Sequence, residues 1–249
     1  MGRERGMRIE PSSKRVRVYL GGEVVADTIR ATMVWEVPYY PTYYFPVEDV
    51  RMEWLTPDGE VRRSPSRGNG ELFTVRVNGV EAPGAALRYP ESPIEELRGL
   101  VRFELDAMDA WFEEDEEMMA HPRDPYHRVD ILAGSRHVRV EVDGVTVAES
   151  SSPRLLFETS LPVRYYLPKT HVRMDLLERS DTTTLCPYKG QAEYWSVRIG
   201  DKVHEDLVWS YPRPLPESQK IAGLVAFYDE KVDVYVDGVK QERPRTMFA

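Results

Sequence analysis

The stretch VRVEVDGVTVA at residues 138–148 decides the fold class. Valines alternate with polar residues up to Asp143-Gly144, and apolar residues alternate again after it. A period of two places the valines on one face of a strand. Asp-Gly supplies the two positive φ angles that a tight hairpin turn needs. The stretch therefore predicts a β hairpin with one buried face.

The same pattern occurs earlier, because residues 15–55 align with residues 137–177 without a gap. At this shift of 122 residues, 14 of 41 positions are identical. Tyr43-Tyr44-x-Pro46 falls on Tyr165-Tyr166-x-Pro168. Two extra residues in the second copy then bring Gly99 onto Gly223. Repetition on this scale predicts two homologous units.

We therefore predict an all-β chain, with two homologous compact units in tandem. Each unit would be a β-sandwich or barrel-like sheet with few short helical turns, since the 19 prolines oppose long helices. Further strands are expected at 32–37, 71–77, 98–104 and 109–112, and at 154–159, 193–199, 222–228 and 232–236. The expected order is a polar segment at 1–14, a first unit at 15–112, an acidic, proline-bearing linker at 113–134, a second unit at 135–240 and a tail at 241–249.

Composition excludes several classes of function. The net charge is −9, with no long basic run, so we expect no nucleic-acid partner. We expect no membrane partner, because no run of 18 apolar residues occurs and the start of the sequence does not resemble a signal peptide. The single cysteine, Cys186, favours a cytoplasmic location. The spacing of histidines and cysteine predicts no metal site, and no motif predicts a cofactor.

The two copies differ most in one segment, and this difference predicts where function lies. Residues 182–190 read TTTLCPYKG, whereas residues 60–68 read EVRRSPSRG. The proline and glycine are shared, but a thiol, a phenol and an amine occur only in the second copy. Trp195 and Trp209 likewise replace smaller side chains of the first copy. We therefore interpret the first copy as a degenerate scaffold.

Four motifs of the second copy carry a family resemblance. They are Cys186-Pro-Tyr-Lys-Gly190, Ala192-x-Tyr194-Trp195-Ser196, Trp209-Ser-Tyr-Pro212 and the segment IAGLVAFY at 221–228. They resemble the signature of the domain of unknown function 427 family. Both copies resemble it and together cover nearly the whole chain, although the first departs at the Cys-Pro-Tyr-Lys-Gly motif. The resemblance implies little about activity.

Cys186 and Lys189 are the candidate catalytic residues. Cys186 is either a nucleophile, a ligand-contacting thiol or a small buried hydrophobe. Lys189 is either an anchor for an anion, an amine nucleophile or a solvated surface residue. We expect them on a loop with Tyr188, above an aromatic wall formed by Trp195 and Trp209.

Other residues complete the predicted ligand site. Tyr194 belongs to it, although strand alternation allows only one of Tyr194 and Trp195 to face inward. Glu158, like its counterpart Glu36, is either an outward strand residue or a buried partner of an arginine, Arg173 in the second copy and Arg51 in the first. Tyr211 and Tyr165 could border the pocket. The histidines at positions 121, 127 and 171 lack acidic or cysteine neighbours at useful spacing, so we predict no role for them.

The leading hypothesis is a cytoplasmic protein that binds a small polar or anionic organic molecule in the second unit. Any chemistry would use Cys186 or Lys189. The alternative is a non-catalytic module for protein interaction or self-association, and the sequence is compatible with an oligomer. A concave site containing Cys186, Lys189 and a tryptophan favours the first hypothesis. A flat, exposed aromatic patch favours the second.

Overall fold

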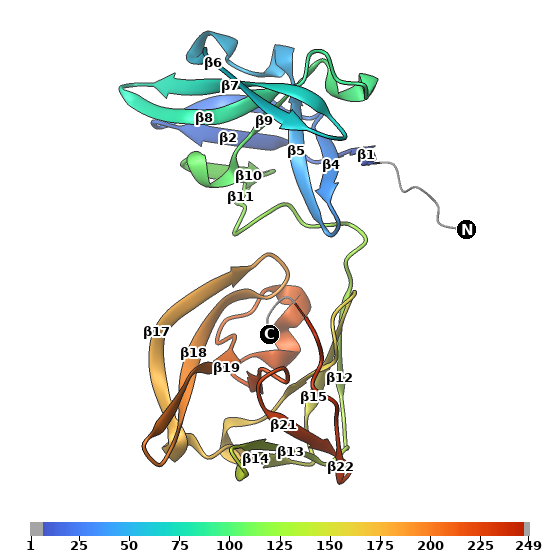
Figure 1. Ribbon diagram of the computed structural model, residues 1–249, viewed down its shortest axis with the longest axis vertical. Coiled ribbons are helices and arrows are strands. Elements are labelled where there is room, and N and C mark those ends of the chain that lie inside the picture. Colours follow the sequence, from blue (N-terminus) through green and yellow to red (C-terminus); the bar gives the residue numbers. More distant parts are fainter. Residues whose placement is uncertain (1–6, 247–249) are drawn as a thin grey trace, which may run out of the picture. The chain divides into compact units, whose positions relative to one another are not determined.

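The computed structural model describes residues 7–246 and divides into two compact units, one up to Asp124 and one from Pro125 (Figure 1). Within the described residues, the regular elements are antiparallel strands and short 3-10 helices. The prediction of an all-β chain with few helical turns is therefore confirmed. None of the helices in residues 7–246 has the length and apolar character that crossing a membrane requires.

Unit 1 contains two antiparallel sheets. Their strand orders are β1-β4-β5-β9-β8-β7-β6 and β11-β10-β2-β3. The strands are β1 (Arg8–Pro11), β2 (Val16–Leu20), β3 (Glu23–Thr28), β4 (Thr32–Val37), β5 (Tyr40–Pro46), β6 (Leu55–Ser64), β7 (Gly68–Val77), β8 (Val80–Arg88), β9 (Leu100–Phe103), β10 (Ala110–Glu113) and β11 (Glu116–Glu117). The 3-10 helices are η1 (Val47–Asp49), η2 (Met52–Trp54), η3 (Glu95–Leu97) and η4 (Leu105–Ala107).

Unit 2 repeats this arrangement with three sheets, ordered β12-β15-β16, β14-β13-β21-β22 and β17-β18-β19-β20. An isolated bridge between Leu167 and Val225 joins the first and third where unit 1 has a continuous sheet. The strands are β12 (Val129–Ala133), β13 (Val138–Val142), β14 (Val145–Ser150), β15 (Arg154–Glu158), β16 (Arg164–Tyr166), β17 (Leu177–Cys186), β18 (Gly190–Ile199), β19 (Lys202–Ser210), β20 (Val225–Phe227), β21 (Asp233–Val236) and β22 (Val239–Lys240). The 3-10 helices are η5 (Lys169–His171), η6 (Met174–Leu176) and η7 (Pro216–Ile221).

The hairpin that decided the fold class is present in both units. Asp143 and Gly144 have φ angles of 47° and 79°, and Gly21 and Gly22 have 58° and 79°. Only glycine adopts such angles freely, and aspartate is among the few other residues that tolerate them. The alternate valines of β13 are buried, as the alternation predicts.

Strand β17 lies where we expected a loop, and Cys186 is its last residue. Most of its side chains are exposed, so its sequence lacks the alternation by which a half-buried strand is recognised. It is an edge strand, held by hydrogen bonds to β18 on one side. Backbone pairing alone therefore defines this strand.

Strand β18 is buried on both faces, which the alternation rule did not predict. Tyr194 and Trp195 are 7% and 8% exposed. Each contributes to a different hydrophobic cluster, because neighbouring side chains point to opposite faces. The expectation that only one of the two faces inward is therefore wrong, since apolar side chains cover both faces of this strand.

The expected linker and N-terminal segment also contain strands. β12 lies within residues 113–134, and its Val129 is paired with Glu158 of β15. β1 lies within residues 1–14 and pairs with β4. Pairing with a distant strand gives these polar segments their structure. Residues 1–6, and residues 247–249 of the expected tail, lie outside the described residues.

Candidate functional site

The turn from Cys186 to Gly190 connects β17 to β18 and presents the segment in which the two copies differ. The amide of Lys189 donates to the carbonyl of Cys186 at 3.3 Å. The turn is also fixed from outside, since the amide of Leu215 donates to the Lys189 carbonyl at 3.1 Å. Gly190 has a φ of +99°, and a Cβ there would lie 3.4 Å from the Arg213 carbonyl oxygen. The backbone therefore holds Tyr188 and Lys189 in a defined position.

The amine of Lys189 is directed at a buried carboxylate. Its Nζ lies 2.5 Å and 2.6 Å from the two oxygens of Glu158, the last residue of β15. The Glu158 side chain is 7% exposed and that of Lys189 is 10% exposed. Removing one partner of an ion pair buried to this degree strongly destabilises a folded protein, because the other charge stays buried without compensation. Lys189 is therefore not a solvated surface residue.

His127 completes this cluster from the segment before β12. Its Nε2 lies 3.0 Å from Oε1 of Glu158. Because an ionised carboxylate only accepts hydrogen bonds, Nε2 carries the proton and donates it. The imidazole stacks on the ring of Tyr188, with 4.1 Å between ring centroids and 23° between planes. We call Glu158, Lys189, His127 and Tyr188 the Glu158 cluster.

The electrostatics of the cluster favour an ionised Glu158. Burial by itself would raise the pKa of this carboxyl. The hydrogen bond from His127 and the charge of Lys189 outweigh burial, so the pKa of Glu158 is lowered. The cluster thus contains a carboxylate whose charge is balanced by the adjacent ammonium.

One polar atom of the Glu158 cluster lacks a hydrogen-bond partner among the described residues. The Nδ1 of His127 is buried and has no hydrogen-bond partner among the described residues 7–246. Buried polar atoms in folded proteins are nearly always hydrogen-bonded, so an orphan indicates a missing partner. In a neutral imidazole whose Nε2 donates, Nδ1 carries a lone pair that can accept a hydrogen bond.

An aromatic cluster lies beside these polar residues. Its members Trp209 and Tyr166 are joined by a hydrogen bond, in which the indole Nε1 donates to the phenol oxygen at 3.0 Å. Tyr194 and Tyr211 belong to the same cluster, and Cys186 packs against it while remaining partly exposed. Burial first, and then the proximity of other groups including Glu158, raise the pKa of Tyr211 well above its usual range.

Three predicted site residues lie elsewhere. Trp195 occupies the opposite face of β18, and the ammonium of Lys169 lies 4.8 Å from the centroid of its ring. Trp195 and Trp209 therefore do not form one wall, because they point to opposite faces of the sheet. Arg173 is exposed and pairs with Asp175 at 2.6 Å. Tyr165 lines a separate cavity.

Two sequence interpretations of charged residues are corrected. The carboxylate of Glu158 is buried as one alternative held, but its partners are Lys189 and His127 in place of Arg173. His127, for which we predicted no role, is one of these partners. His127 and Glu158 are 31 positions apart in the sequence, and they meet because β12 pairs with β15. No local spacing in the sequence could show this contact.

The comparison with known families matches the description Domain of unknown function (DUF427) at residues 8–114 and again at residues 130–238. The chain belongs to the DUF427 family. The two matched segments fall one in each structural unit, so the protein is a tandem pair of DUF427 units. The comparison with curated proteins found no match.

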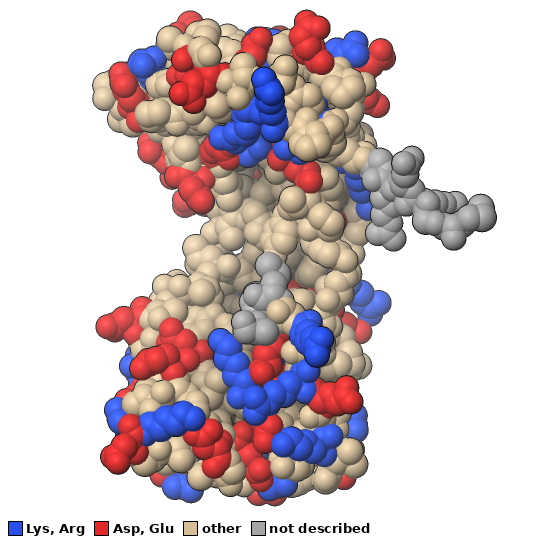
Figure 2. All heavy atoms as spheres, in the orientation of Figure 1, with Lys and Arg blue, Asp and Glu red and all other residues tan. Residues whose placement is uncertain are grey.

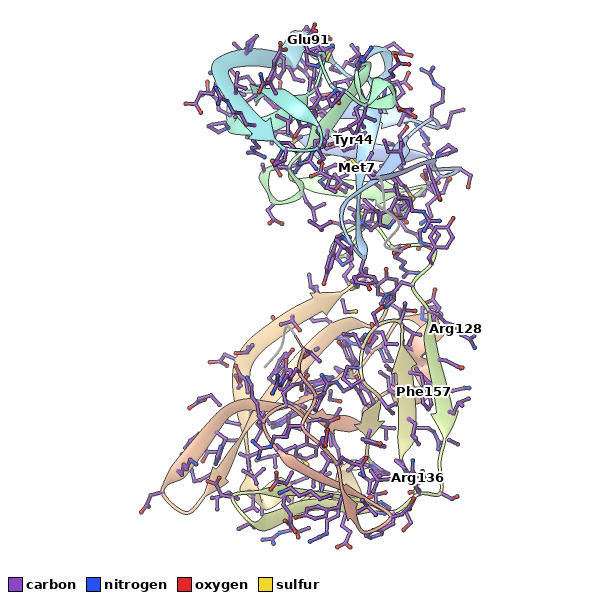
Figure 3. All side chains as sticks on the ribbon, turned by 45° about the vertical axis from the view of Figure 1, so that its right-hand side comes forward. Met7, Tyr44, Glu91, Arg128, Arg136 and Phe157 are labelled. Atoms are coloured by element: carbon purple, nitrogen blue, oxygen red, sulfur yellow. The ribbon has the colours of Figure 1, made fainter. Side chains whose placement is uncertain are left out.

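The first DUF427 unit has a counterpart of the Glu158 cluster. Glu36, at the position equivalent to Glu158, lies 3.1 Å from Arg102 and 3.2 Å from Arg67. It also accepts a hydrogen bond of 2.5 Å from the hydroxyl of Tyr44, which is labelled in Figure 3. Arg67 is the equivalent of Lys189. We call these four residues the Glu36 cluster.

Proposed function

We propose that the second DUF427 unit binds a small polar organic molecule at the Glu158 cluster. The Nδ1 of His127 would accept a hydrogen bond from a hydroxyl, amine or amide group of the ligand. The ring of Tyr188 would contact the flat or apolar part. Cys186, at the edge of the aromatic cluster beside the same turn, would contact the ligand and is the candidate nucleophile if a reaction follows.

The observation that carries this proposal is the buried, unpartnered Nδ1 of His127. An acceptor left without a partner in a low-dielectric environment costs about 1–3 kcal/mol. A ligand that supplies a proton donor recovers that cost. Tyr188, which stacks on the imidazole, is partly exposed, so a ligand that displaces this ring would approach His127 from the solvent side.

The charge balance narrows the class of ligand. Both oxygens of Glu158 lie within 2.6 Å of the Lys189 ammonium, so the lysine is not an uncompensated cation. An anionic ligand would have to displace Glu158 from Lys189. The cluster therefore favours a neutral polar molecule over the anion that Lys189 alone suggested.

The face seen in Figure 2 does not favour a nucleic-acid partner. Figure 2 shows lysines and arginines interspersed with acidic residues on the visible face of each unit. Phosphate backbones require basic side chains gathered on one face. A small molecule makes no such demand on the surface.

The test is a metabolite-extract binding screen with the full chain. The decisive variant is His127→Phe, which keeps a ring for Tyr188 to stack on and removes Nδ1. Lys189→Ala and Cys186→Ser complete the set. The matched control is Arg67→Ala, which removes the equivalent cation from the Glu36 cluster. We expect compounds retained by the wild type and by Arg67→Ala to be lost from His127→Phe.

A second measurement keeps the test independent of variant stability. In nitrogen NMR spectra of labelled histidine, a bound ligand should shift the Nδ1 resonance of His127 more than those of the other histidines. Unchanged imidazole spectra at saturating ligand, together with identical retention by all variants, would refute the proposal.

The alternative, an interaction module, has one observation in its favour. Phe157, labelled in Figure 3, is 39% exposed on β15, and Leu132 on the adjacent β12 is 48% exposed. Exposed apolar residues in such small numbers are normal on protein surfaces. If Phe157→Ser abolished a concentration-dependent dimer in sedimentation experiments, this surface would become the better candidate.

A further inference from the structure

Each unit contains a cavity at the equivalent place. The cavity of unit 1 has a volume of about 230 Å³ and that of unit 2 about 220 Å³. The repeat alignment matches Tyr43 with Tyr165, and past its two-residue insertion it matches Leu105 with Asp229. All four residues line their cavities. Both units therefore have a hollow at this place, and among the differences in its lining is an apolar residue in unit 1 where unit 2 has an acidic one.

An ion pair lies near the cavity tyrosine in both units. In unit 1 the Tyr43 hydroxyl donates to Glu113 at 2.8 Å, and Lys14 pairs with the same carboxylate. In unit 2 the equivalent ion pair joins Arg136 and Asp237 at 2.8 Å. Its charges, together with that of Asp229, act on the pKa of Tyr165, which burial raises. The ring of Tyr165 lines the cavity within reach of these charges.

The unit 2 cavity holds an incompletely balanced carboxyl group. Arg164 makes two hydrogen bonds to Glu230, at 2.9 Å and 2.5 Å. The same guanidinium lies 3.5 Å from Asp229. It is the one cation paired with Asp229 in the described part of the chain. One positive charge therefore faces two carboxylates.

The position of Asp229 makes this imbalance costly. Asp229 is 9% exposed. Burial raises the pKa of this carboxyl to about 7, and the negative charge of Glu230 acts in the same direction. A cation entering the cavity would supply the missing positive charge.

We propose that the unit 2 cavity binds a small organic ammonium ion, with the ammonium group against Asp229. The alkyl part would lie among Pro162, Val232 and Val234, and the ring of Tyr165 adds an attraction for the cation. The volume is below the range usual for drug-sized ligands, so the ligand has few non-hydrogen atoms. This site is separate from the Glu158 cluster.

Unit 1 provides the contrast that makes the inference specific. Leu105 stands where unit 2 has Asp229. Two acids line that cavity: Glu104 is already paired with Arg62 and Arg102, and Asp106 is exposed. The first cavity therefore lacks the buried carboxyl, and we expect it not to bind the ammonium ion.

The experiment is calorimetric titration of the full chain with propylammonium chloride, with propan-1-ol as the neutral probe of similar shape. We expect the ammonium ion to bind and the alcohol not to. Asp229→Asn should weaken binding at least tenfold, whereas Leu105→Asn in the equivalent cavity should leave it unchanged. Equal binding of both probes, or equal affinity of wild type and Asp229→Asn, would overturn the proposal.

Two further measurements protect the test against misfolding of Asp229→Asn. Val163→Tyr fills the cavity from its rim without altering any charge, and it should also abolish binding.

The dissociation constant of the wild type should rise about tenfold from pH 8 to pH 6, because an acid with a pKa of about 7 is mostly protonated at the lower value. The other groups around the site are Arg164, Glu230, Tyr165 and Glu242, and Glu242→Gln measures the share of the rim carboxylate. A pH-independent affinity would contradict the role of Asp229.

Discussion

The Glu36 cluster and the Glu158 cluster occupy equivalent positions and keep a buried carboxylate, but they satisfy it differently. Glu36 is bound by two guanidinium groups and a phenol hydroxyl. Glu158 is bound by one ammonium and one imidazole. The first arrangement gives its carboxylate several partners, whereas the second leaves the imidazole Nδ1 without one among the described residues. Nε of Arg102 in the Glu36 cluster is also buried without a partner among the described residues, so each cluster has one unpartnered nitrogen: a guanidinium donor in unit 1 and an imidazole nitrogen in unit 2.

The cause of this difference is a coordinated change of one cross-strand pair. Leu87 faces Arg102 between β8 and β9, and Trp209 faces Ala226 between β19 and β20. A small residue opposite the indole replaces the arginine that bound the carboxylate. The phenol at the equivalent position, Tyr166 in unit 2, then bonds to the indole and no longer to the glutamate. Exchanging large and small residues across the pair conserves volume, which a packed core requires.

The largest expected change in stability follows from removing the Lys189 cation. Lys189→Met leaves Glu158 buried with only His127 and should destabilise unit 2 by about 3–5 kcal/mol. Arg67→Met, the matched change in unit 1, leaves Glu36 with Arg102 and Tyr44 and should cost about 1–2 kcal/mol. Hydrogen exchange followed by mass spectrometry reports each unit separately. Equal losses of protection would show that the two clusters are energetically alike.

The next effect concerns the cross-strand pair. Trp209→Leu removes a buried indole and the hydrogen bond to Tyr166, at a cost of about 2–4 kcal/mol. Adding Ala226→Arg restores the pair found in unit 1 and should recover part of that loss. The free energy of unfolding in urea measures both variants. If the double variant were less stable than Trp209→Leu, volume exchange would not explain the difference between the units.

Lowering the pH should reduce the difference in stability between the wild type and Glu158→Gln. The pKa of Glu158 is lowered in the folded protein, so its ionised form contributes stability above the unfolded pKa of about 4.3. That contribution is lost as the pH falls through the folded pKa. We therefore expect a larger difference in urea midpoint at pH 7 than at pH 3. A difference that does not change with pH would mean that Glu158 carries no stabilising charge.

The smallest expected change in stability follows from removing the Tyr188 ring that stacks on His127. Tyr188→Ser places the unit 1 residue in the turn and removes the stack on His127, which should cost about 1 kcal/mol. Ser66→Tyr, the reverse change in unit 1, should have no comparable effect on stability. Thermal unfolding measures both. A cost above that of Trp209→Leu would show that the turn, and not the aromatic cluster, stabilises the site.

The sequence predicted the turn residues of the site but not the residue that comes from a distant segment. Comparison of the two copies identified Lys189 and Tyr188, because a local segment differed while its proline and glycine were kept. It could not find His127, since that contact depends on the pairing of β12 with β15. Strand β17 escaped prediction because an exposed edge strand has no apolar period. The common wall of Trp195 and Trp209 failed because the sheet places them on opposite faces.

The sequence by itself determined the duplication, the all-β class and the segment in which the copies diverge, since each is written in local periodicity or in alignment of the chain with itself. Tertiary structure alone decided that the Lys189 amine meets a carboxylate, that an imidazole completes the cluster, and that Asp229 enters a hollow. These contacts join residues far apart in the chain. Their energies come from burial and charge balance, which exist only once the strands are paired.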